Sequence, residues 1–135
     1  MNSHVVLEAA RASLTGALSF PQIVRNLIAA GVESYHVDDI VLQFTFYGAD
    51  AAPLSFEGLP NVAADFDVPA LRLAIQDSQQ KGQQYREFSQ RAMRAGVQGY
   101  FVFLRGQRVT YLGRQGDQHT EWFPGAEPTG APARA

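Results

Sequence analysis

The sequence predicts a single α+β domain made of two ααβββ halves related by a pseudo-two-fold axis, with helices packed on one face of an antiparallel sheet. The first observation behind this is a set of identical residues 65 positions apart: Gly31 and Gly96, Tyr35 and Tyr100, Val37 and Val102. The second is that each half contains two helical patterns followed by three strand patterns. The third is the size, because 135 residues with 46% hydrophobic content suit one buried core.

The first half contains two predicted helices and three predicted strands. We expect helices at residues 3–14, with Ser3 as the cap, and at residues 20–30, with Ser19 as the cap. Strand patterns rich in aromatic and β-branched residues follow Gly31, at residues 33–39, 40–48 and 52–58.

The second half is expected to repeat this order without a gap, so that residues 68–122 match residues 3–57. A connecting loop at 58–67 leads to a helix capped by Asp67, and a second helix ends at Gly96. A hairpin over 99–113 and a short strand near 118–124 complete the predicted domain at residue 124, and the tail 125–135, rich in Pro, Gly and Ala, is expected to be flexible.

Alternation along the strands sorts their side chains onto two faces of the predicted sheet. One face is uniformly apolar and should meet the helices: Tyr35, Val37, Phe44, Phe46, Tyr100, Val102, Val109 and Tyr111. The other, the open face, is mixed, and it carries our candidate ligand or interface residues: His36, Asp38, Tyr47, Phe101, Phe103, Arg108 and Leu112. An uncovered face of this kind is typical of a self-association surface or a ligand cleft.

Composition and charge narrow the functional classes. The formal net charge is -2, which argues against nucleic acid as a partner. Cysteine is absent, so disulfides, thiolate metal sites and cysteine nucleophiles are excluded. With no apolar run of membrane-spanning length and no signal-like N-terminus, we expect a soluble, cytoplasmic protein that does not bind membranes.

Two short histidine motifs could carry chemistry. In His36-Val37-Asp38 and in His119-Thr120-Glu121 an acid follows a histidine by two residues, so each pair should share one face of a strand. Such groups could bind a metal ion or act as general acid and base. Because the tripeptide is common, we assign no metal site and no cofactor, and treat a small metal-dependent or acid/base enzyme as the alternative function.

The segment after residue 110 holds a second polar cluster. Glycines flank Arg114, and the other charged residues follow closely: Asp117, His119 and Glu121. A glycine-flanked arginine beside exposed backbone amides could bind an anion, although a tight turn with a surface ion pair explains the same residues.

The stretches RNLIAAGVESYHVD and AGVQGYFVFLRGQRVTYLGRQGDQHTEWFP resemble the bacterial and prophage family catalogued as domain of unknown function 1398, whose members are often labelled "phage envelope protein". The resemblance spans the chain up to Pro124. It implies a small, soluble, accessory bacterial protein and no established activity or catalytic residues. Nothing in the sequence supports the envelope label.

We therefore expect a non-enzymatic module that binds a small molecule or a protein through the open face. A two-fold homodimer is the partner that this face favours, since monomers seldom leave aromatic patches uncovered.

Overall fold

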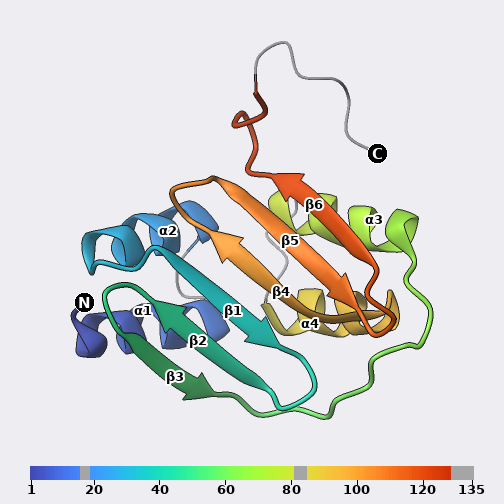
Figure 1. Ribbon diagram of the computed structural model, residues 1–135, viewed down its shortest axis with the longest axis horizontal. Coiled ribbons are helices and arrows are strands. Elements are labelled where there is room, and N and C mark those ends of the chain that lie inside the picture. Colours follow the sequence, from blue (N-terminus) through green and yellow to red (C-terminus); the bar gives the residue numbers. More distant parts are fainter. Residues whose placement is uncertain (16–18, 81–84, 129–135) are drawn as a thin grey trace.

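The computed structural model describes residues 1–15, 19–80 and 85–128; the end of the predicted flexible tail, 129–135, lies outside them. The described part forms four helices and six strands in the order ααβββααβββ (Figure 1). The elements are α1 (Ser3–Thr15), α2 (Phe20–Ala29), β1 (Ser34–Asp38), β2 (Gln43–Tyr47), β3 (Ala51–Ser55), α3 (Val68–Gln80), α4 (Tyr85–Arg94), β4 (Val97–Phe103), β5 (Arg108–Gly113) and β6 (Gln118–Trp122).

All six strands belong to one antiparallel sheet with the order β3-β2-β1-β4-β5-β6. The two halves meet where β1 pairs with β4, and His36 lies opposite Phe101 at the middle of that pair. All four helices lie behind the sheet in Figure 1, on the same face. In that view α1 and α2 are toward the left, and α3 and α4 are toward the right. The predicted fold class is therefore confirmed: a single α+β domain with helices on one face of an antiparallel sheet.

The core lies between the sheet and the helices. All eight side chains assigned to the helix-facing side are buried there, together with apolar residues from each helix, such as Leu27 and Leu71. Burial alternates strictly along β1 and through most of β2, as expected for a sheet with one covered face.

Side chains at the helix starts satisfy backbone N–H groups that have no partner within the helix. Ser19 forms a capping box with Gln22 at the start of α2. Asp67 Oδ1 accepts a hydrogen bond from Ala70 N at the start of α3. At α1 the cap is Asn2, whose Oδ1 accepts from Val5 N, so the expected cap at Ser3 is wrong by one residue.

The spacing between the two halves changes at the third strand. Ser3 and Val68, which begin α1 and α3, are 65 positions apart, as are Phe20 and Tyr85 at the starts of α2 and α4. Ala51 and Gln118, which begin β3 and β6, are 67 positions apart. The gapless match up to residue 122 is therefore wrong, because the connection into β6 is two residues longer. Element order agrees between the halves, while the internal duplication itself stays a prediction.

The turn between β1 and β2 is longer than expected. Ile40 and Val41 were predicted to be strand residues, but the structure places both in a turn that leaves Val41 largely exposed. The cause is Asp38, whose Oδ1 accepts hydrogen bonds from the backbone N–H groups of both residues, at 2.9 and 3.1 Å.

Candidate functional site

The open face carries a band of aromatic side chains. His36 and Phe101 lie side by side across β1 and β4, with ring centroids 4.4 Å apart, and Phe101 stacks with Phe103 at 6.0 Å. Partial burial lowers the pKa of His36 below its ordinary value, and the nearby charge of Asp38 opposes that shift. At neutral pH this histidine is therefore mainly an uncharged ring within the aromatic band.

The row of residues along one end of this face remains partly exposed. Tyr47 and Phe103 keep 39% and 36% of their surface accessible. The Arg108 guanidinium lies over the Trp122 ring, 5.1 Å from its centroid. Leu112 lies four residues further along β5 than Arg108, on the same side of the strand, and is half-buried. The predicted open-face residues thus do share one side of the sheet.

The two histidine motifs do not form one site. His119 lies opposite Tyr111, on the helix-facing side of the sheet, whereas His36 is on the open face. Asp38 caps a backbone turn, and His119 Nε2 hydrogen-bonds to Glu121 Oε1 at 2.8 Å. A shared metal or acid/base centre of these four residues is therefore wrong. Among the described residues, no group of three or more His, Asp or Glu side chains could hold a metal ion.

The polar cluster after residue 110 is also divided between the two sides of the sheet. Arg114 Nη1 donates to the backbone oxygen of Val62, at 3.1 Å, and so fastens the loop that joins the halves. The backbone oxygen of Asp117 closes the turn by accepting from Gly113 N at 2.8 Å. Because His119 and Glu121 face the helices, the four side chains do not converge on an anion.

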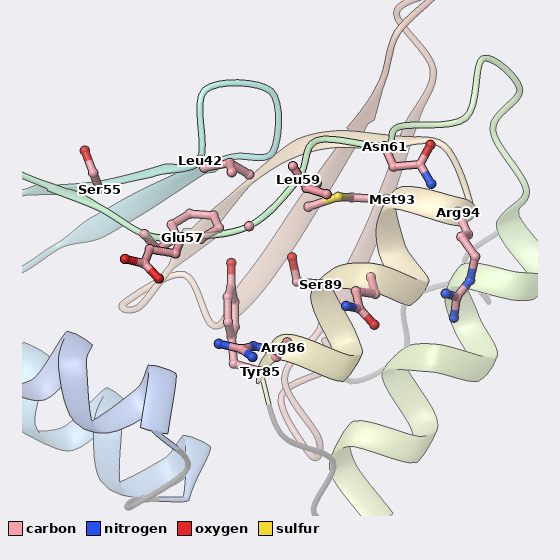
Figure 2. Close-up of a pocket in the computed structure, with 13 residues that line it drawn as sticks. Leu42, Ser55, Glu57, Leu59, Asn61, Tyr85, Arg86, Ser89, Met93 and Arg94 are labelled. Carbon is pink, nitrogen blue, oxygen red and sulfur yellow. The ribbon is translucent and has the colours of Figure 1, made fainter.

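The larger of two cavities in the described part of the chain lies on the other side of the sheet, beside α4 (Figure 2). It has a volume of about 790 Å³, within the usual range for small-molecule sites. Its lining comes from α4, from the turn before β2 and from the segment that follows β3. The apolar part of the wall comprises Leu42, Phe56, Leu59 and Met93.

Two residues of α4 with hydroxyl groups, Tyr85 and Ser89, belong to the lining of this cavity. They are one helical turn apart, and Figure 2 shows both side chains directed from α4 toward the segment that carries Glu57 and Leu59. The Tyr85 oxygen itself is buried. The Tyr85 ring is held against Phe44 and Phe56, with centroids 5.3 and 5.9 Å away. The cavity therefore combines apolar walls with a small, rigid polar group, as ligand sites commonly do.

Asp39 is the most unusual residue near this cavity. It follows Asp38 at the end of β1, so alternation turns its side chain toward the helices. The residue has 0% of its surface exposed, and neither carboxyl oxygen has a hydrogen-bond partner among the residues that the structure describes. A buried polar group without a partner costs free energy, so its presence calls for a functional explanation.

Burial and, to a smaller extent, the adjacent charge of Asp38 together raise the pKa of Asp39 to about 8. Asp39 is therefore mainly a neutral acid at pH 7. Burial also raises the pKa of Tyr85, and the charge of Asp39 adds to that shift. The hydroxyls of Tyr100 and Ser89 lower the pKa of Tyr85 slightly, but neither forms a hydrogen bond of good geometry with it.

A smaller cavity of about 400 Å³ shares Tyr85 with the first and extends to Phe20 and Phe123. Glu121 lies on its wall and is 3.5 Å from Arg72 Nε. With His119 bound to the same carboxylate, this group is already satisfied by its own partners.

The sequence prediction missed the cavity and Asp39. Two signals were available. Asp39 comes directly after a predicted strand, at a position where alternation directs its side chain toward the helices. The residue 65 positions later is Leu104, which is buried. A carboxylate in a position whose counterpart is apolar core is an anomaly that comparison of the two halves can reveal.

The chain is similar to proteins of mycobacteria. Uncharacterized protein Rv2012 of Mycobacterium tuberculosis and uncharacterized protein Mb2035 of Mycobacterium bovis are each 31% identical to it over 116 residues. The matched region covers 82% of this chain and 70% of each relative. No protein-family model matches the chain, so the resemblance to domain of unknown function 1398 stays a hypothesis. No helix in the described ranges could span a membrane.

Proposed function

Because the chain belongs to the family of these uncharacterized mycobacterial proteins, whose names give no activity, we propose a function from its own surface: a small-molecule binding module with its site in the cavity beside α4. The observation that carries the proposal is the mixed lining of this cavity, in which Tyr85 and Ser89 join Leu42, Leu59 and Met93, with the buried carboxyl of Asp39 close enough for its charge to act on Tyr85.

This proposal keeps the expected binding role but moves the ligand from the open face to the helix side of the sheet. The larger cavity is lined by no residue of the aromatic band. Its volume, about 790 Å³, and its mixed wall suit a compact ligand with an apolar body and one polar group. An enzymatic role has less support, since the residues that suggested it do not form one centre.

The test is binding of small amphiphiles detected by ligand-observed NMR. Sodium octanoate, octylammonium chloride and 1-octanol share one apolar body and differ in the polar group. We expect at least one of them to bind, with roughly tenfold weaker affinity in the double variant Tyr85→Phe/Ser89→Ala, because both hydroxyls are lost with little other change to the side chains.

The matched control is Tyr111→Phe, which removes a buried hydroxyl that lies outside the larger cavity. The control should bind like the wild type. If none of the three probes binds, or if the control loses affinity as much as the double variant, the proposed function is wrong.

The open face favours a second candidate function, association with a second copy of this chain. The face has a negative charge at Asp38 and a positive one at Arg108, and the pairing register places Phe101 midway between them. A two-fold axis through Phe101 would place Asp38 of each copy opposite Arg108 of the other copy, which gives two identical ion pairs. Such isologous contacts are those of the commonest oligomers.

Phe103→Glu should separate this dimer without unfolding the chain, because it places an unpaired charge within the buried contact. Leu73→Glu is the matched control, since Leu73 is exposed on α3, on the other side of the sheet. Light scattering with circular dichroism gives the result. A wild-type protein that is monomeric at high concentration contradicts self-association.

A further inference from the structure

The polar groups around the larger cavity determine which ligand chemistry it can accept. Tyr85 and Ser89, on its α4 wall, carry hydroxyls that can each donate one hydrogen bond. The Tyr85 oxygen is buried and has no partner among the described residues, so only a group inserted beside it can accept its hydrogen bond. The charged residues of the lining are Glu57, Arg86 and Arg94, so the lining has one more positive than negative charge. An oxygen-rich, negatively charged group therefore fits better than a cation.

The apolar part of the lining sets the form of the rest of the ligand. Leu42, in the turn before β2, and Leu59, in the segment after β3, lie across the cavity from α4, and Met93 lies on α4 one turn beyond Ser89 (Figure 2). Methionine adapts to irregular shapes, and Leu59 keeps 87% of its surface exposed where no ligand covers it. A flexible hydrocarbon body would cover this exposed surface.

From this arrangement, which rests on the proposed function, we propose that the cavity binds an amphiphilic carboxylic acid, whose carboxylate accepts hydrogen bonds from Tyr85 and Ser89 while its apolar body lies against Leu42, Leu59 and Met93.

Asp39 makes this specificity depend on pH. The groups whose charges act on it or respond to it are Asp38 on β1, Tyr85 on α4 and Tyr100 on β4, and Tyr35 on β1 acts in turn on Tyr85 and Tyr100. The tyrosines stay neutral at any ordinary pH because burial raises the pKa of each. Asp39 is thus the group that changes charge, and its ionisation would repel a bound carboxylate and attract a bound ammonium ion.

Isothermal titration calorimetry on the full chain, at pH 6.5 and pH 9, tests the proposal with octanoate, octylammonium and 1-octanol. We expect octanoate to bind best at pH 6.5 and to lose affinity as Asp39 ionises, by up to tenfold per pH unit above pH 8. Asp39→Asn should bind octanoate equally at both pH values, because it cannot ionise. Arg86→Gln should weaken octanoate several-fold and leave octanol unchanged.

The outcomes separate this proposal from the proposed function. If octanol or octylammonium binds in the cavity and octanoate does not, the binding function stands and the carboxylic acid assignment is wrong. An octanoate affinity that rises with pH, or that falls equally in Asp39→Asn, contradicts the role of Asp39. Absence of binding by all three probes refutes both.

Discussion

The two halves have the same order of elements, yet they differ at three positions around the cavity. Tyr85 and Ser89 line it, and Asp39 is buried outside the lining but close enough for its charge to raise the pKa of Tyr85; we call these three residues the Asp39 set. The positions 65 residues away in the other half are Leu104, Phe20 and Val24, the Leu104 set. Every polar group of the first set has an apolar counterpart in the second.

This difference teaches that the fold does not require the polar groups. Leu104 is 1% exposed and belongs to the core, and Val24 packs against that core. The Asp39 set occupies the corresponding positions with a carboxyl and a phenol that lack hydrogen-bond partners. Since such groups reduce stability, their presence in one half only indicates a function there.

The largest expected effect on the free energy of unfolding comes from replacing Leu104 with an aspartate, the residue found at the corresponding position 39. Leu104→Asp removes a fully buried side chain and buries an unpaired carboxyl in its place. We expect a loss of about 5 kcal/mol in the free energy of unfolding, measured by urea denaturation. Leu104→Ala, which lacks the charge, should lose less. A loss below about 1 kcal/mol for Leu104→Asp would mean that both positions tolerate an acid, and the contrast between the sets would fail.

The next effect is the pH dependence that Asp39 gives to stability. Its pKa rises from 3.8 to about 8 in the folded chain, so the folded state holds a proton that the unfolded state releases between these values. Stability therefore falls as pH rises through this range. Between pH 5 and pH 8 the wild type should lose about 4 kcal/mol relative to Asp39→Asn, in urea denaturation at both pH values. Parallel pH profiles for the two proteins would show that Asp39 titrates normally.

The smallest effect concerns the phenol. Tyr85→Phe should raise the free energy of unfolding by about 1 kcal/mol, because a buried hydroxyl without a partner is removed. The reciprocal Phe20→Tyr should change it by less than about 0.5 kcal/mol, since Phe20 is 43% exposed and the new hydroxyl can reach water. Urea denaturation midpoints compare the two. Destabilisation by Tyr85→Phe would show that this hydroxyl has a partner in the folded chain.

The sequence predicted the fold well because local patterns determine it. Alternation along the strands identified every helix-facing core residue that was assigned, and Ser19 and Asp67 marked two helix starts. The prediction failed at the turn that Asp38 caps and at the longer connection into β6, where a few local hydrogen bonds override the pattern.

The candidate site was harder to predict because it depends on tertiary packing. His36 and His119 have the same tripeptide pattern, but only the strand register shows that they face opposite sides of the sheet. The cavity is formed by α4 and by the segment after β3, which are about 30 residues apart in the sequence. No periodicity links these segments, so Asp39 was recognisable only by comparison with Leu104.

The most direct test of the central claim is to locate bound octanoate by NMR chemical-shift mapping at pH 6.5. We expect the largest shifts on Tyr85, Ser89 and Met93, small shifts on Phe20 and Val24, and no saturable change in the double variant Tyr85→Phe/Ser89→Ala. Shifts centred on Phe20 and Val24, or on the aromatic band around Phe101, would contradict it, because the ligand would then bind away from the Asp39 set.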